Sequence, residues 1–507
     1  MTVSDDLFQL IKSLNKSEKG YFKKFVYKGE GKRDSVYLKL FDILDKQETF
    51  DEEKLKKRWL KMGNSSQLSL AKNYLNKLIM NSLVEYHHSN SVDAKLHRLL
   101  DEIAVLYKKG LYQQAVKTLK KARKIALLHE KFQIGLILQR WDEELLHVSG
   151  DFEGIDNYLV KGFNEELRLA EQHSNYRKFR KVCIDFFSQI RKQTTVRHKE
   201  YKEKIENLIS EPILGSDSYA LSLKAKSQRY YVLLMYYRLT GDLERSLHYR
   251  IKHVKLIENN PQFLKENKMT YLRVISNQIA VELDLKRWND VGKTLEKLNG
   301  INLTDLQEKL YRFQITCEVG LQRINGCGLH EGFDETELVE KYQQYEYAMS
   351  GIGKMLLGNA FGTFFFIKGD FDEALNWFEL VNRKDKDGIL EDLVSIAKIL
   401  ILICHYELGH FRVLHHIETS TYRYLKKRTG DFKLEGVFLK YLRKMANAPN
   451  LKEFTPELVK LKQELKSFEQ DEFEKGVFAH FDLDAWLDSK IEKQPMWQVL
   501  KRKMSHV

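Results

Sequence analysis

A short glycine-containing turn recurs between apolar helical stretches of this sequence. Examples are KKGLYQQAVKTL (108–119), LTGDLERSLHYR (239–250) and IKGDFDEALNWF (367–378). Successive turn positions are spaced by 40, 91, 46, 82 and 40 residues, for the series Gly110, Gly150, Gly241, Arg287, Gly369 and Gly409. Because the two long gaps are nearly twice the short ones, we expect further turns near residues 195 and 328. The spacing therefore predicts about eight helical hairpins, each repeating after roughly 40 residues or slightly more.

Proline is scarce, which favours a chain that is helical almost throughout. The sequence has five prolines in 507 residues, whereas proline makes up about 5% of average proteins. Proline removes a backbone donor and clashes with the preceding turn inside a helix. One hairpin cannot bury its own apolar face, but stacked hairpins can. We therefore predict an all-α fold, a right-handed α-α superhelix of about eight stacked hairpins.

The segment GTFFFIKGDFDEALNWF (362–378) resembles a tetratricopeptide repeat. Gly362, Phe365, Ala374 and Phe378 match the small and aromatic packing positions of that repeat, and GDFDEA matches its inter-helix turn. The period here exceeds the usual 34 residues, and the usual terminal proline is missing. The resemblance covers residues 95–430. It implies a concave surface that is lined by the first helix of each hairpin and binds partners.

The two ends of the chain do not follow this register. Residues 1–94 are predicted to form an N-terminal helical module, and KSLNKSEKGYFKKF (12–25) resembles the opening of a group of uncharacterised bacterial TPR-like proteins. Residues 431–507 are predicted to form a helical C-terminal cap. In that cap, Thr455 and Pro456 are suited to be the N-cap and first residue of a helix. The aromatic run FAHFDLDAW (478–486) is expected to pack against the last hairpin.

Residues 51–84 have the spacing of a helix-turn-helix. The second helix would place Leu68, Ala71, Leu75, Leu78 and Ile79 on one face, and polar side chains suited to bases and phosphates on the other. Those candidate nucleic-acid-binding residues are Ser66, Gln67, Lys72, Asn73 and Lys77. The alternative is that these helices begin the solenoid with an ordinary solvated face. We expect the candidates to be buried or partly occluded.

A basic stretch between residues 177 and 204 is the main candidate for partner binding. It carries ten Lys and Arg residues and three acidic ones. The candidate residues are Arg177, Lys178, Arg180, Lys181, Arg191 and Lys192. A basic surface attracts an acidic peptide or a nucleic-acid backbone. The alternative is a set of solvated helix faces in a protein whose formal net charge is +13.

The sequence carries no signature of a catalytic, cofactor or metal site. GxxxxGK[ST], HExxH and GxSxG are all missing, so we predict no enzyme activity and no cofactor. The cysteines are scattered without a CxxC pair, which is typical of reduced thiols and favours a cytoplasmic location. The longest apolar stretch, IAKILILIC (396–404), is far shorter than a bilayer span.

The sequence therefore favours a non-catalytic scaffold that binds a protein or peptide partner on its concave surface. Clusters of aromatic residues on two first helices, 230–237 and 361–366, would supply core residues and, where exposed, partner contacts. The second hypothesis is a DNA-binding regulator, in which residues 51–84 read DNA and the TPR-like body senses a peptide or dimerises. That layout resembles the bacterial peptide-sensing regulators that join a helix-turn-helix to tetratricopeptide repeats.

Overall fold

The computed structural model describes most of the chain and divides it into two compact units, residues 1–167 and 168–507. The described residues are 3–30, 36–61, 68–88, 91–149, 158–190, 196, 199–303, 305–327, 335–383, 390–426, 433–446, 451–468, 471, 474 and 481–505. All regular structure within these ranges is helical, and none of it is β-strand. The predicted all-α class is thus confirmed. The domain boundaries at 94 and 430 stay predictions.

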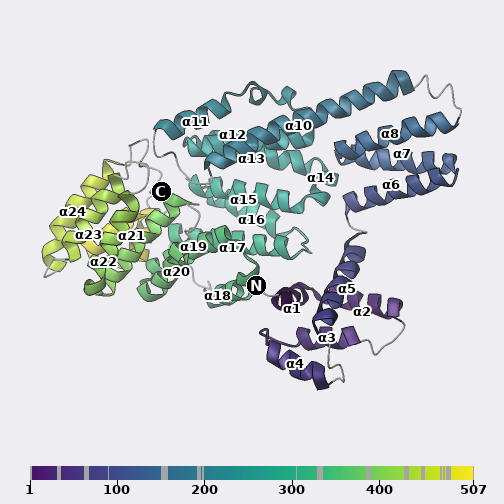
Figure 1. Ribbon diagram of the computed structural model, residues 1–507. Helices are drawn as coiled ribbons and strands as arrows, with labels where there is room; N and C mark the ends of the chain where they lie inside the picture. The colour runs from purple at the N-terminus through teal and green to yellow at the C-terminus, as the bar shows by residue number, and fades with distance from the viewer. Residues whose placement is uncertain are drawn as a thin grey trace. The chain divides into compact units, whose positions relative to one another are not determined.

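The first unit contains two groups of helices with separate apolar cores (Figure 1). The first group comprises α1 (Val3–Ser13), α2 (Lys16–Glu30), α3 (Val36–Asp45), α4 (Glu52–Lys61) and α5 (Leu68–His88). Phe22, Phe41 and Leu75 are fully buried in its core. The second group comprises α6 (Val92–Lys108), α7 (Tyr112–Leu128) and α8 (Phe132–Ser149). Ala115, Leu119 and Ala122 of α7 pack there without exposed surface.

The long helix α10 (Phe163–Ile190) runs from the first unit into the second, and a short π-helical turn (Tyr158–Gly162) precedes it. The second unit continues with α11 (Lys199–Ile209), α12 (Leu223–Leu239), α13 (Leu243–Glu258), α14 (Pro261–Glu266), α15 (Lys268–Asp284), α16 (Trp288–Asn299), α17 (Leu306–Cys327) and α18 (Glu335–Tyr345). It ends with α19 (Gly351–Lys368), α20 (Phe371–Arg383), α21 (Glu391–Glu407), α22 (Phe411–Lys426), α23 (Lys433–Ala446), α24 (Leu451–Lys466), α25 (Leu483–Glu492) and α26 (Met496–Ser505).

Helices of the second unit pack in pairs that follow chain order (Figure 1). The two helices of each pair contact one another. The pairs are α12 with α13, α15 with α16, α19 with α20, and α21 with α22. First helices also contact the first helix of the next pair, in the series α15, α17, α19, α21 and α23. This sequential pair packing is consistent with a helical repeat.

At four of the predicted turns, the residue that ends the preceding helix is a glycine with a left-handed backbone. Gly110, Gly241, Gly369 and Gly409 have φ values of +71°, +82°, +91° and +71°. A left-handed residue ends a helix without the steric cost that a side chain would add. In the turn predicted near 287 this conformation belongs to Lys286, with φ of +56°. The turns predicted at 150, 195 and 328 fall outside the described residues.

One hydrogen bond repeats at these turns, except at that of Gly241, and also at a turn that the sequence did not indicate. The amide of Asp370 donates to the carbonyl of Phe365 at 2.9 Å, and that of His410 donates to His405 at 2.9 Å. The same six-residue closure links Lys131 to Ala126 at 2.8 Å, between α7 and α8. This closure is the Schellman motif, which satisfies carbonyls at a helix end. Glu130 supplies the left-handed residue there, with φ of +48°.

The best-matching repeat unit packs as its sequence predicts. Ala374 and Phe378 of α20 have no exposed surface, and Phe365 of α19 is 7% exposed. Gly362 faces the ring of Phe378 so closely that a β-carbon built on it would lie 2.6 Å from Phe378 Cε1. The small residue therefore lets an aromatic side chain fill the crossing between α19 and α20.

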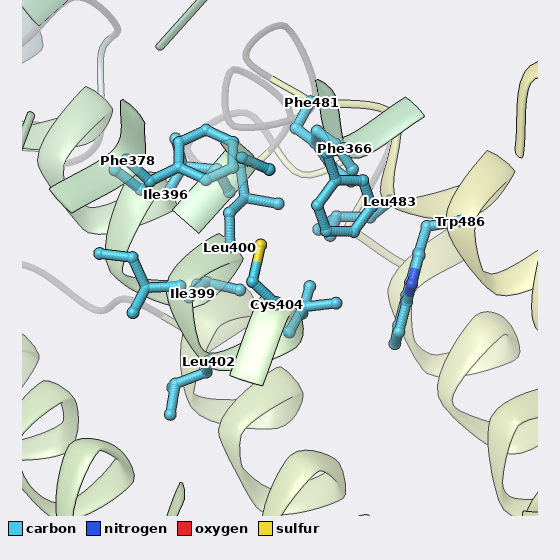
Figure 2. Packing of buried hydrophobic residues seen from close by; sticks show 14 of the residues in the cluster. Phe366, Phe378, Ile396, Ile399, Leu400, Leu402, Cys404, Phe481, Leu483 and Trp486 are labelled. Atoms are coloured by element: carbon cyan, nitrogen blue, oxygen red, sulfur yellow. The ribbon is translucent and has the colours of Figure 1, made fainter. Parts of the chain in front are cut away.

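The C-terminal helices fold back onto first helices of the preceding pairs. Helix α26 packs against α17 and α19, and α25 packs against α24. Figure 2 shows Phe481 beside Phe366 of α19, with Leu483 and Trp486 next to them, and the Phe366 and Phe481 ring centroids lie 5.1 Å apart. The tail is therefore part of the same apolar core as α19 and α21.

Helix α24 starts earlier than the sequence indicates. The predicted N-cap, Thr455, lies inside this helix, which begins at Leu451 and contains Pro456. Proline is tolerated in a first turn because the missing donor has no partner there. Because the helix begins at Leu451, Pro456 lies beyond its first turn. The prediction of a helix start at Thr455 was wrong.

Candidate functional site

The basic face of α10 carries four of the predicted partner-binding residues. Arg177, Lys178, Arg180 and Lys181 are all exposed. Arg191 and Lys192 lie outside the described residues. The opposite side of α10 buries Phe179, Val182 and Phe186 in the core that α10, α11 and α12 share. The helix is therefore amphipathic, with its cations directed away from that core.

Two exposed apolar side chains adjoin these cations. Ile184 is 54% exposed and Phe187 is 49% exposed. Spacings of four and three residues place Arg177, Lys181 and Ile184 on one side of the helix. We call Arg177, Arg180, Lys181, Ile184 and Phe187 the α10 face. It combines positive charge with apolar surface, which is a common composition of protein interaction surfaces.

Hydrogen bonds to the segment before α12 fix the rotation of α10. Gln172 Nε2 donates to the carbonyl of Leu221 at 3.0 Å. Asn175 Nδ2 donates to the carbonyl of Tyr219 at 2.8 Å, and its Oδ1 accepts from the amide of Leu221 at 3.1 Å. Gln172, Asn175 and Phe179 follow one another on the packed side. These bonds hold the α10 face outward.

Lys72, one of the candidate nucleic-acid-binding residues, is buried. Its residue exposure is 8%, and Nζ lies 3.6 Å from Glu52 Oε1 and 5.9 Å from the centre of the Phe50 ring. Lys72 is predicted on the polar side of α5, but it lies four residues after Leu68 and three before Leu75, on the apolar side. This placement was wrong, because Lys72 packs with the core of the N-terminal helices.

The exposed side of α5 mixes polar side chains with large apolar ones. Asn73 and Lys77 are exposed there, whereas Ser66 and Gln67 lie outside the described residues. Leu70 is 61% exposed and Val84 is 59% exposed, and helical spacing puts both on the same side as Asn73 and Lys77. Protein surfaces that bind DNA are strongly polar and positive, so this side of α5 gives little support to DNA reading.

The two aromatic clusters have different environments. Phe361, Phe364, Phe365 and Phe366 of α19 are all buried, so they are core residues. On α12, Tyr230 is buried, whereas Tyr231, Tyr236 and Tyr237 are partly exposed. The Tyr237 ring stacks on Tyr249 of α13, with centroids 5.7 Å apart and an interplanar angle of 4°.

The described cysteines lie in surroundings that suppress thiolate formation. Cys317 and Cys404 are buried and Cys183 is partly buried, and Figure 2 shows the Cys404 sulfur among apolar side chains. Burial raises the pKa of the Cys183 thiol to about 11 and that of Cys317 to about 12. A protonated thiol is a poor nucleophile and a poor metal ligand.

The described part of the chain contains neither a metal-ligand cluster nor a membrane span. No three His, Cys, Asp or Glu side chains among the described residues are grouped so that they could hold a metal ion. His405 and His410 approach through their Nδ1 atoms at 3.1 Å. No helix within the described ranges combines the length and the apolar composition that crossing a bilayer requires.

A group of buried polar residues connects α12 and α13. Ser227 Oγ lies 2.7 Å from His253 Nε2, and His253 is 2% exposed. Arg250 has no exposed surface, and its Nε donates to Ser246 Oγ at 3.2 Å. The Nη1 and Nη2 atoms of Arg250 and the Nδ1 atom of His253 are buried and have no hydrogen-bond partner among the described residues.

Acid is expected to destabilise the second unit through His253. Burial, together with the charge of Arg250, lowers the pKa of His253 from 6.5 to about 3. In the unfolded chain His253 becomes protonated as the pH falls below 6.5, whereas in the folded chain it stays neutral until the pH approaches 3. The contribution of neutral His253 to the free energy of unfolding is therefore fully present above pH 6.5 and is lost as the pH falls toward 3. The loss at pH 5 should be about 2 kcal/mol. Urea unfolding of the wild type and of His253→Gln at pH 7.5 and 5 measures it. Equal pH dependence in the two proteins would contradict the assignment.

Comparisons with known proteins identify no relative. No protein-family model matches this sequence, and neither a curated protein nor a solved structure shows significant similarity to it. The structure therefore supports an all-helical protein with sequential helix pairs, and the family stays unidentified.

Proposed function

We propose that this protein is a non-catalytic interaction scaffold that binds an acidic protein or peptide partner through the α10 face. The observation that carries the proposal is the exposure of Arg177, Arg180 and Lys181 beside Ile184 and Phe187. Charge steers an acidic partner to such a face, and the apolar residues supply area that becomes buried on binding. The rigid attachment of α10 lowers the ordering cost of association.

The packing of first helices against one another supports a partner surface on their side of the repeat. Helices that approach their successors closely are expected on the shorter, inner side of a curved array. In the second unit α17 and α19 are first helices, and α26 already packs against both of them. The first-helix surface that remains open to a partner would therefore lie in the earlier part of the second unit, which begins within α10.

Reversing two charges of the α10 face should abolish capture of the partner. Arg177→Glu with Lys181→Glu places two acids where an acidic partner needs cations, so capture from a lysate of the native cell should fall at least about tenfold. Both side chains are exposed, so folding should be unaffected. Quantitative mass spectrometry of the proteins retained by wild-type and variant baits measures the loss.

The matched control reverses two exposed lysines on α11, which shares an apolar core with α10. Lys199→Glu with Lys204→Glu on α11 makes the same change of net charge at side chains that are 83% and 56% exposed. Capture by this control should equal that of the wild type. If both variants lost partner capture equally, binding would depend on net charge alone, and the proposal of a specific α10 face would be refuted.

A further inference from the structure

Helix α7 carries a row of lysines that no acidic side chain of the same helix balances. Its sequence, YQQAVKTLKKARKIALL, has four lysines and one arginine but neither Asp nor Glu. The side that contacts α6 and α8 buries Ala115, Leu119 and Ala122. All four lysines are exposed, namely Lys117, Lys120, Lys121 and Lys124. Because residues three and four positions apart are neighbours on a helix surface, these lysines form one continuous positive strip.

The ion pairs around α7 use other cations. Arg123 of α7 pairs with Asp142 of α8 at 2.9 Å, and Lys131 pairs with Asp93 of α6 at 2.8 Å. None of the four exposed lysines takes part in an ion pair with any residue that the structure describes. The strip is therefore a concentration of positive charge that its own helix group does not neutralise.

Helix α11 shows how this chain balances lysines on an ordinary solvated helix. Lys199 pairs with Glu203 and Lys204 pairs with Glu200, each across a four-residue spacing. On α7 the neighbours at that spacing are further lysines, and like charges so placed repel one another and destabilise the helix. An anionic surface laid along α7 would relieve that repulsion.

Two exposed leucines extend the lysine strip at the C-terminal end of α7. Leu127 is 55% exposed and Leu128 is 51% exposed. Leu128 lies four residues after Lys124, and Leu127 lies three after it, so both are on the lysine side of the helix. We call this surface the α7 face, and it consists of Lys117, Lys120, Lys121, Lys124, Leu127 and Leu128.

We propose that the α7 face binds an anionic lipid surface, with α7 lying parallel to it. A row of lysines beside exposed leucines matches both parts of such a surface, because lysines attract the headgroups and leucines enter the boundary with the acyl chains. A nucleic-acid backbone offers the charge but no apolar region. The α7 face also has no aromatic ring on which bases could stack. This proposal is independent of the α10 face.

The test is sedimentation of the full-length protein with vesicles of phosphatidylcholine, prepared with and without phosphatidylglycerol. The protein should sediment with the anionic vesicles and stay in solution with the neutral ones. Binding should weaken as the salt concentration rises, because salt screens exposed charges. Absence of binding to the anionic vesicles at low salt would overturn the proposal, as would equal binding to both kinds of vesicle.

Lys120→Gln with Lys124→Gln should weaken binding to the anionic vesicles at least about tenfold. Both side chains are exposed, so the midpoint of thermal unfolding should not fall. The matched control is Lys199→Gln with Lys204→Gln on α11, which makes the same change of net charge. It should bind the vesicles as the wild type does. Equal weakening in the two variants would assign binding to net charge and would overturn a specific α7 face.

Leu127→Ser with Leu128→Ser separates a lipid surface from a nucleic acid. Removing the two leucines should weaken vesicle binding about tenfold without changing the net charge. A DNA duplex added at the same phosphate concentration should fail to displace the wild type from the anionic vesicles. Unchanged vesicle binding by the leucine variant, or complete displacement by the duplex, would overturn the lipid assignment and would indicate a nucleic-acid backbone as the partner of this face.

Discussion

Trp486→Ala is expected to lower the free energy of unfolding of the second unit by about 3–5 kcal/mol. The Trp486 side chain is 1% exposed, and its ring centroid lies 5.7 Å from that of Phe438. Its Nε1 donates to Glu407 Oε1 at 3.0 Å. Truncation therefore removes a large apolar contact, opens a cavity and deprives a largely buried carboxylate of one donor. Chemical denaturation followed by circular dichroism measures the loss.

Trp486→Phe separates the packing from the hydrogen bond. Phenylalanine keeps most of the ring volume but has no N–H group, while Lys490 still pairs with Glu407 at 2.6 Å. The loss should be about 1–3 kcal/mol, clearly smaller than for alanine. If Trp486→Ala left stability unchanged, the C-terminal helices would not be part of the repeat core.

Gly362→Ala should destabilise the second unit by about 1–3 kcal/mol. The added β-carbon would lie 2.6 Å from Phe378 Cε1 and 2.7 Å from Cδ1, and Phe378 is fully buried and cannot move away freely. Gly292→Ala in α16 is the matched control, because a β-carbon there meets nothing within 4 Å. Alanine has the higher helix propensity, so Gly292→Ala should stabilise by about 0.5–1 kcal/mol.

Opposite signs for these two glycine substitutions would confirm that Gly362 is retained for packing. Thermal unfolding of both variants beside the wild type decides the matter. If both substitutions stabilised the protein, the close crossing of α19 and α20 would be refuted.

The turns could be predicted because their chemistry is local. A glycine in a left-handed conformation ends a helix through its own backbone, so Gly110, Gly241, Gly369 and Gly409 were found from the sequence. Glu130 and Lys286 adopt the same conformation without being glycine. The first was missed, and the second was placed one residue too late. The closing hydrogen bonds of the turn set the φ values of Glu130 and Lys286. Residue type alone therefore does not predict that these two residues are left-handed.

Packing between elements distant in sequence could not be predicted in the same way. Lys72 is a different case, because helical spacing alone places it on the apolar side of α5 although its side chain is charged. The contact between α26 and the first helices α17 and α19 depends on the path of the tail, which no local pattern specifies. The burial of Arg250 also depends on tertiary packing, because α13 contacts both α12 and α15.

The α10 face is the central functional claim, and photo-cross-linking tests it most directly. A photoreactive amino acid replaces Ile184 in one variant and Lys293, an exposed residue of α16, in another. The cross-linked species are identified by mass spectrometry after irradiation in the native cell. The account predicts that the probe at 184 captures one acidic partner, that the probe at 293 does not, and that Arg177→Glu with Lys181→Glu removes the product. Cross-links of equal yield from both positions, or a product that survives the charge reversal, would contradict it.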